Sequence, residues 1–205
     1  MTKVDLKKTI PSYAARKGQI AEIEVPPMAY LMLDGHGDPN TSQEFAEALQ
    51  ALYPVAYKTK FASKRELDRD YVVPPLEATW SADDMAAFTS ARDKSQWDWT
   101  VMLLLPDWVE ESLVEAGREE VGRKDPPARL SDVRIERLHE GLAVQTLHVG
   151  PFDAEAAVLQ EVHDSYIASH GLTMAGRHHE IYLSDLRKTA PERQRTILRQ
   201  PVRRA

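Results

Sequence analysis

The stretch MAYLMLDGHGDP (residues 28–39) passes from an apolar run directly into a turn. Its first half is apolar at almost every position, which is typical of a buried β-strand, and the glycines and proline of Asp34–Pro39 end that strand. Beyond the turn, Thr41 and Glu44 have the spacing of a capping box, and apolar residues then recur at helical spacing until Pro54. The sequence therefore predicts a strand, a tight turn and a short amphipathic helix.

Two more strands and a connector follow this helix. Residues 71–80 are typical of a strand whose prolines suit a sheet edge, whereas residues 97–105 are apolar throughout their second half and predict a central strand. Asp107 and Glu110 again have capping spacing, and the apolar residues after them share one helical face until the breakers of residues 122–127. The first half of the chain therefore predicts a β-α-β-β order followed by a helical connector.

The second half of the chain repeats this order. A strand is predicted over residues 142–149, and after a turn at Gly150 an amphipathic helix runs to a stop at Gly171. Strands around residues 177–184 and 195–199 complete the set. Both halves thus contain a strand, a Gly-containing turn, a helix and two further strands, which indicates two copies of one structural unit.

These elements predict an α+β fold made of duplicated β-α-β-β modules. We expect an N-terminal arm at residues 1–18, and then a single domain over residues 19–205 that consists of two repeats, about residues 19–105 and 130–205. Two such modules can pair around a pseudo-twofold axis, and we expect a central ligand cleft where they meet.

Composition excludes several classes of function. The chain has 205 residues, of which 42% are hydrophobic and 28% charged, and its formal net charge is −6 without a long block of one sign. Direct nucleic-acid binding and membrane insertion are therefore not expected. Because Cys is absent, disulfides, thiolate metal sites and Cys nucleophiles are excluded. The first residues contain no apolar run typical of a signal peptide, so we predict a cytoplasmic protein.

The segment GRHHEIYLSD (residues 176–185) carries the strongest chemical signal. Strand alternation predicts that His178, Glu180 and Tyr182 share one face, whereas His179 lies on the opposite, core face. A carboxylate beside an aromatic ring can attract a cation, or act as a general acid or base when desolvation raises its pKa. The alternative is an ordinary polar strand face exposed to solvent.

Neither metal binding nor a nucleic-acid surface is favoured by the remaining polar residues. His178 and His179 are adjacent in a predicted strand, so they point to opposite faces and do not chelate one ion together. The other histidines lack ligand spacing and are expected to be surface or satisfied residues. The basic cluster near the C-terminus is expected to be a solvated strand edge and tail; it comprises Arg193, Arg195, Arg199, Arg203 and Arg204.

Aromatic residues provide the walls of the expected cleft. Most of the tryptophans and tyrosines are expected to fill the core. The others, closed by one carboxylate, suit flat, lipophilic or cationic ligands, because ring faces attract positive charge and offer apolar area. Such a site binds many ligands.

An ordered series of motifs resembles a known family over nearly the whole chain. The motifs are KVDLKK (3–8), VPPM (25–28), DGHGDPN (34–40), ALY (51–53), YVVPPLE (71–77), WTVM (99–102), residues 145–151, HHEIYLSD (178–185) and TAPE (189–192). This series is similar to the GyrI-like small-molecule-binding proteins, in particular the stand-alone branch without a DNA-binding domain. The sequence departs from that branch at Ser81, where an aromatic often follows Trp80, and at Ala78, where Gly often follows Glu77.

The resemblance implies an SHS2-like pair of modules with a ligand cleft. We expect no cofactor. In multidrug-sensing relatives a buried Glu at the position matched by Glu180 faces aromatic ligands. Members of the stand-alone branch resemble detoxifying hydrolases that open the cyclopropane of DNA-alkylating natural products. Glu180 and Tyr182 are the implied catalytic residues, and the ligand-binding residues are expected to be Tyr53, Tyr71, Trp80, Trp99, Met102 and His178.

Two functions remain open at this point. The first is binding of lipophilic, flat or cationic small molecules, with or without hydrolysis of electrophilic cyclopropanoids by a water that Glu180 activates. The second is a non-catalytic sensor or scavenger that acts through a protein partner. Some relatives are named for inhibiting gyrase, but no segment of this sequence identifies a gyrase-binding surface.

Overall fold

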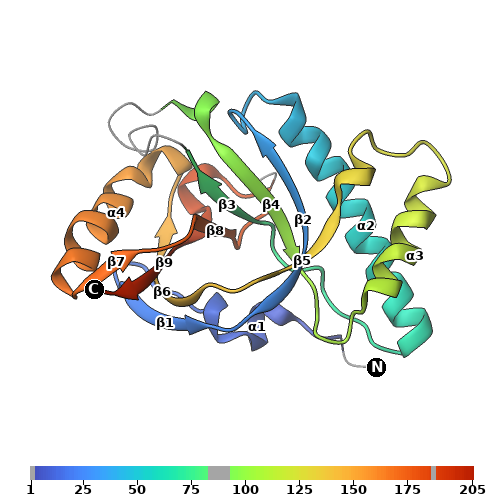
Figure 1. The fold of residues 1–205 in the computed structure, drawn as a ribbon, viewed down its shortest axis with the longest axis horizontal. Helices are drawn as coiled ribbons and strands as arrows, with labels where there is room; N and C mark the ends of the chain where they lie inside the picture. Colours follow the sequence, from blue (N-terminus) through green and yellow to red (C-terminus); the bar gives the residue numbers. More distant parts are fainter. Residues whose placement is uncertain (1–2, 83–92, 186–187) are drawn as a thin grey trace. The chain divides into compact units, whose positions relative to one another are not determined.

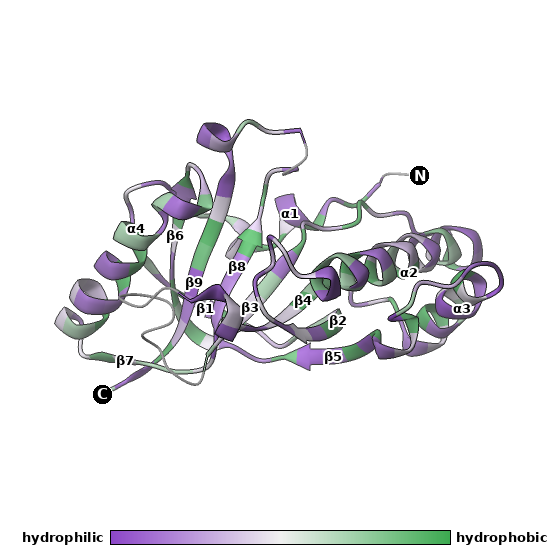
Figure 2. Ribbon diagram, turned by 90° about the horizontal axis from the view of Figure 1, so that it is seen from above, coloured by the Kyte–Doolittle hydropathy of each residue, from purple (hydrophilic) through white to green (hydrophobic). Residues whose placement is uncertain are grey.

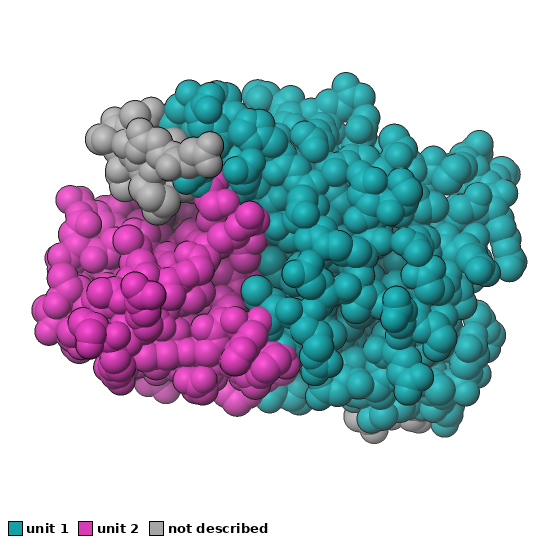
Figure 3. Space-filling view, in the orientation of Figure 1, with its two compact units in different colours: residues 1–9, 28–74, 82–138 teal, residues 10–27, 75–81, 139–205 magenta. Residues whose placement is uncertain are grey.

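The computed structural model describes residues 3–82, 93–185 and 188–205. Within these residues the chain forms nine β-strands and four α-helices (Figure 1), which confirms the expected α+β class. The chain divides into two compact units (Figure 3). Unit 1 comprises Met1–Thr9, Met28–Pro74 and Ala82–Leu138, and unit 2 comprises Ile10–Pro27, Pro75–Ser81 and His139–Ala205.

Unit 1 contains three antiparallel strands in the order β4-β2-β5. They are β2 (Met28–His36), β4 (Asp98–Leu104) and β5 (Arg134–Leu138). The first two confirm the predicted apolar strands, and most of their residues are buried. Strand β5 was not predicted. It pairs with β2 alone among the strands of unit 1, and a strand paired on one side only needs no apolar run. Its sequence RIERL is mostly charged and therefore gives no pattern that would indicate a strand.

Helix α2 (Gln43–Leu67) begins one residue later than predicted. The side chain of Ser42, rather than Thr41, accepts a hydrogen bond from the backbone N–H of Phe45 at 3.3 Å. The helix ends where Asp68 adopts a left-handed conformation with φ 55°. The shift of the N-cap from Thr41 to Ser42 does not change how the helix begins, because the hydroxyl of Ser or Thr can accept from a free N–H of the first turn.

The expectation that Pro54 ends this helix is wrong, because α2 continues for three more turns. An internal proline costs about 3 kcal/mol. Burial on both sides of it opposes this cost, since Ala51, Leu52, Val55 and Ala56 are all buried. Helix α3 (Glu111–Gly122), which begins later than the predicted Asp107, packs alongside α2, and both helices carry hydrophilic and hydrophobic residues (Figure 2).

Unit 2 contains the other six strands, with β1-β6-β9-β8-β3 in one antiparallel order and β7 paired with β9. They are β1 (Ala21–Val25), β3 (Glu77–Ser81), β6 (Gly141–Val149), β7 (Leu172–Met174), β8 (His178–Tyr182) and β9 (Arg195–Arg204). The strand predicted from residue 71 begins only at Glu77. Before the prolines, Tyr71 forms only an isolated parallel bridge with Val4, and Pro74 and Pro75 have no N–H to donate to a continuing strand.

Helix α4 (Ala156–Gln160) continues into the π-helix η6 (Glu161–Ile167), which confirms a helix in this region. Val162 and Ile167 of η6 pack against Val144 of β6 and Val202 of β9. The strand registers place these two valines on the same sheet face as Glu180. The remaining short elements are α1 (Leu6–Thr9) and the 3-10 turns Pro11–Tyr13, Lys94–Gln96, Leu130–Asp132, Phe152–Ala154 and Pro191–Arg193.

The two units are built from interleaved segments of the chain. Strands β1 and β3 both lie within the first predicted repeat, yet both belong to unit 2. The predicted repeats describe the order of elements along the chain, and they stay a prediction. Within the predicted N-terminal arm, Leu6 and Tyr13 are buried. None of the described helices is both long and apolar enough to cross a membrane.

Candidate functional site

One face of β8 carries the residues that the strand alternation singled out. In the register with β3, Trp80 lies opposite His178, and Ala78 lies opposite Glu180. Cross-strand partners point to the same side of a sheet, so these four residues share a surface with Tyr182. We call this surface the Glu180 face. Directly opposite Glu180 stand Ala78 of β3 on one side and Leu198 of β9 on the other.

The carboxylate of Glu180 contacts two polar side chains of its own strand. The hydroxyl of Tyr182 donates a hydrogen bond to Glu180 Oε2 at 2.7 Å. The other oxygen, Oε1, lies 3.6 Å from His178 Nε2, which is beyond hydrogen-bond distance. The side chains of His178 and Glu180 are 10% and 13% exposed. The carboxylate is therefore largely desolvated but still reachable from solvent.

Tyr182 is held among aromatic and acidic side chains. The ring of Phe152 meets it edge to face, with 5.7 Å between ring centroids. Burial raises the pKa of Tyr182 well above its usual value, and the negative charge of Glu180 adds to this, whereas a hydrogen bond from Trp80 opposes it. The phenol therefore stays protonated at neutral pH, so it acts as a donor toward Glu180.

His163 of the π-helix η6 approaches the same face. Its ring lies edge to face with that of His178, with 6.1 Å between centroids. Burial lowers the pKa of His163 to about 4, and the neighbouring His178 adds to the decrease. The His163 imidazole is therefore neutral at pH 7. His163 was expected to be a surface or satisfied histidine, because its contact with β8 depends on how η6 packs and not on spacing along the chain.

In the part of the chain that the structure describes, three polar side chains at this face have buried atoms without a hydrogen-bond partner. They are both ring nitrogens of His178, Nε2 of His163 and Oγ1 of Thr196. Thr196 pairs with Tyr182 across β9 and β8, so it belongs to the Glu180 face. Buried polar atoms are nearly always bonded to protein, solvent or a ligand. The cluster therefore offers a carboxylate and several unused hydrogen-bonding atoms to a molecule that enters it.

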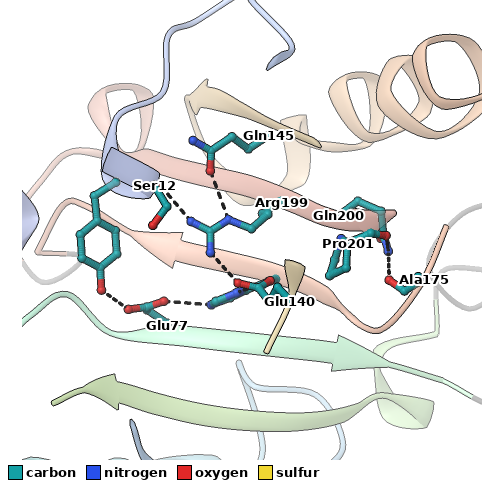
Figure 4. A network of polar contacts seen from close by, with 10 residues as sticks. Ser12, Glu77, Glu140, Gln145, Ala175, Arg199, Gln200 and Pro201 are labelled. Atoms are coloured by element: carbon teal, nitrogen blue, oxygen red, sulfur yellow. Dashed lines mark hydrogen bonds and ion pairs between the residues drawn. The ribbon is translucent and has the colours of Figure 1, made fainter. Parts of the chain in front are cut away.

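The opposite face of β8 carries a buried ionic network, which is shown in Figure 4. His179 is fully buried, and its Nε2 lies 3.0 Å from Glu77 Oε2 while its Nδ1 lies 3.0 Å from Glu140 Oε1. Arg199 Nη1 is 2.6 Å from Glu140 Oε2. The predicted alternation assigned His179 to the core face, but the charged partners that occupy this core with it were not foreseen.

The prediction that Arg199 is part of a solvated edge is wrong. Its side chain is fully buried, and it donates hydrogen bonds to Gln145 Oε1 at 3.1 Å and to the carbonyl of Ser12 at 2.8 Å (Figure 4). Tyr13 donates a hydrogen bond to Glu77. Residues 11–13 thus cover this part of the sheet, and their position is a tertiary contact that the pattern of β9 does not contain.

The network shifts the pKa values of its members in opposite directions. Burial lowers the pKa of His179, but the carboxylates of Glu140 and Glu77 outweigh it and raise the value to about 9. Burial likewise raises the pKa of Glu140, but His179 and Arg199 outweigh it and lower the value to about 2. At neutral pH His179 is therefore a cation and Glu140 an anion. Among the described residues no group of three His, Asp or Glu is arranged to hold a metal ion.

Stability is expected to fall on the alkaline side because of His179. Its pKa is raised from 6.5 to about 9, so its contribution is complete below pH 6.5 and is lost as the pH rises to 9. At about 1.4 kcal/mol per unit, the free energy of unfolding should decrease by about 3 kcal/mol over this interval. Urea denaturation at several pH values measures the decrease. The variant His163→Phe should retain it, and a flat profile in the unaltered protein would contradict this role of His179.

The predicted ligand residue Trp99 lies in unit 1 and is fully buried. Its ring meets Phe45 edge to face at 5.0 Å between centroids. A Cβ at Gly35 would lie 2.1 Å from the indole, so glycine is needed for the ring to pack across β2. Trp99 therefore fills the core of unit 1, and its proposed contact with a ligand stays a prediction.

The other predicted ligand residues of unit 1 are Tyr53, Tyr71 and Met102. Tyr71 and Met102 are buried, and Tyr53 is partly buried. The ring of Tyr71 meets that of Trp108 edge to face at 6.2 Å. The structure thus brings together Glu180, Tyr182, Trp80 and His178 within unit 2. The predicted ligand residues Tyr53, Tyr71, Met102 and Trp99 are instead packed within unit 1.

Small-molecule sites are lined mostly by apolar and aromatic side chains with a few placed polar groups, and the Glu180 face has this composition. The family model of the GyrI-like small-molecule-binding domain matches residues 18–203. The chain therefore belongs to the GyrI-like family, and the resemblance stated from its motifs is confirmed.

Solved structures agree with this assignment. An uncharacterized conserved protein from Listeria innocua is 40% identical, with a TM-score of 0.88, and the match covers 98% of this chain and 100% of that one. A hydrolase from Listeria innocua is also 40% identical, with a TM-score of 0.84 and the same coverage. The C-terminal domain of EcmrR shares the fold at 12% identity, with a TM-score of 0.55 over 91% of this chain and 98% of that one. No curated protein matched the chain.

Proposed function

We propose that the Glu180 face binds lipophilic, flat or cationic small molecules. The observation that carries this proposal is a largely desolvated carboxylate whose Oε1 accepts no hydrogen bond from the residues that the structure describes, since His178 Nε2 approaches it only to 3.6 Å. A desolvated carboxylate gains most from a cation, because opposite charges attract strongly where water is excluded. The rings of Tyr182 and Trp80 provide apolar area, and their faces favour positive charge.

The same carboxylate could serve hydrolysis of strained electrophiles such as cyclopropanoids. Glu180 Oε1 would take a proton from water as the water oxygen bonds to a cyclopropane carbon. The C–C bond then breaks, and its electron pair moves to the conjugated carbonyl of the substrate, which takes up a proton. Tyr182 holds the carboxylate through its hydrogen bond to Oε2. A hydrolase among the structures that are 40% identical supports this version.

The proposal is tested first by binding. Titration with the flat cation ethidium, followed by tryptophan fluorescence, should show saturable binding that weakens about 10- to 100-fold in Glu180→Gln, because a charge-assisted contact contributes about 1.5–3 kcal/mol. The substitution keeps the shape and removes the charge. Glu24→Gln, at an exposed position on β1, is the matched control and should leave affinity unchanged. Equal affinities in all three proteins would contradict a ligand-binding Glu180.

The alternative is a sensor or scavenger that binds such molecules without changing them. It shares the binding prediction and differs only in product formation. Binding with no product from a cyclopropanoid, under conditions where the ligand saturates the site, favours this alternative over a hydrolase.

A further inference from the structure

Two histidines from different secondary-structure elements come together at the Glu180 face. His163 comes from the π-helix η6 and His178 from the start of β8, and their rings are 6.1 Å apart at 83°. The π-helical turn alters which side chains face the sheet, and such turns are frequent at functional sites. Glu180 lies next to this pair, 3.6 Å from His178.

Three of the four ring nitrogens of these histidines have no hydrogen-bond partner among the described residues. Nε2 of His163 and both ring nitrogens of His178 are buried without a hydrogen-bond partner. A neutral imidazole has one acceptor nitrogen and one donor nitrogen. Leaving such an atom buried and unbonded is costly, so a ligand that supplies the missing partner gains affinity in proportion.

The charge of the cluster determines which kind of partner fits. Glu180 places negative charge beside the His178 imidazole, which disfavours an anionic ligand and favours a cation. A cation that carries N–H groups can pair with the carboxylate and donate to the imidazole acceptors at the same time. A fully N-alkylated cation can use only its charge and its apolar surface.

We propose that His163 and His178 make this site selective for flat cations with exocyclic N–H groups over their N-alkylated counterparts. The inference rests on the proposed function, since it names the ligand class that the Glu180 face prefers. His163 and His178 accept the N–H groups, while Glu180 pairs with the charge and Tyr182 and Trp80 contact the ring system.

A matched pair of acridine dyes tests this selectivity. Proflavine and acridine orange have the same acridinium ring and are both cations at neutral pH, but the first has two amino groups and the second two dimethylamino groups. Calorimetric titration at pH 7 should show proflavine bound at least about 10-fold more tightly, as expected for one additional hydrogen bond to a desolvated polar group.

The variant His163→Phe separates hydrogen bonding from steric fit. Phenylalanine keeps a ring of similar size and removes the acceptor, so the preference for proflavine should shrink toward onefold while the affinity for acridine orange stays within about threefold. His178→Phe should act in the same direction. Urea denaturation confirms that each variant is folded before its titration is interpreted.

The outcomes distinguish this inference from the proposed function. Equal binding of both dyes by the unaltered protein overturns the selectivity but leaves the binding function intact. An unchanged preference in both histidine variants shows that the methyl groups are excluded by shape, and it overturns the role of the imidazoles. Failure of both dyes to bind overturns the proposed function and this inference together.

Discussion

Replacing His179 by leucine should lower the free energy of unfolding by about 3–5 kcal/mol. His179 lies between Glu77 and Glu140, at 3.0 Å from an oxygen of each, and all three side chains are at most 3% exposed. Leucine has a similar volume but no charge, so it leaves Glu77 buried without a cationic partner among the residues described around it. Urea denaturation at pH 7 measures the effect through the unfolding midpoint.

The neighbouring histidine provides a matched control. His178 is the adjacent residue on the same strand, but it points to the Glu180 face, and its ring has no hydrogen-bond partner in residues 3–82, 93–185 and 188–205. His178→Leu should therefore cost less than about 1 kcal/mol, because it leaves no buried charge unpaired. The double variant His179→Leu/Glu77→Gln should recover part of the loss, since the amide can still accept from Tyr13. Equal losses in the two single leucine variants would contradict the network's role.

Turnover of a cyclopropanoid is the second large expected effect. If Glu180 accepts the proton of the attacking water, Glu180→Gln should lower kcat by about 10²- to 10⁴-fold, which is the range that a positioned general base contributes. Gln has the same shape but does not accept a proton at neutral pH. The rate of product formation at saturating substrate measures kcat separately from the weaker binding of the variant.

Tyr182→Phe serves as the comparison for this experiment. It retains the ring that meets Phe152 and removes only the hydrogen bond to Glu180 Oε2. Because Tyr182 positions the carboxylate without being the base, its loss should reduce kcat less than Glu180→Gln does. Unchanged turnover in Glu180→Gln rules out the base. Absence of product from the unaltered protein, when the substrate is bound, assigns the site to a sensor or scavenger.

Local patterns predicted the parts of the fold that depend on neighbours along the chain. Strands β2, β4, β6, β8 and β9 and the start of α2 were expected close to their observed positions. The length of α2 was not, because Pro54 is a strong local signal whose cost is opposed by packing on both sides. Strand β5 was missed because an edge strand needs no apolar run.

The candidate site divides in the same way. The alternation of β8 was sufficient to group His178, Glu180 and Tyr182 and to separate His179 from them. It did not indicate that Trp80 lies opposite His178, because strand pairing joins segments that are distant in sequence. Nor did it indicate the approach of His163, which depends on the packing of η6 against the sheet.

The sequence by itself determined the α+β class, the GyrI-like motifs and which residues of β8 share a face, since these follow from spacing along the chain. Tertiary structure alone decided that Arg199 and His179 are buried as ions. Their partners Ser12, Glu77 and Glu140 come from three other segments, and burying a charge is tolerated only where such partners converge. A pattern of single residues carries no information about that convergence.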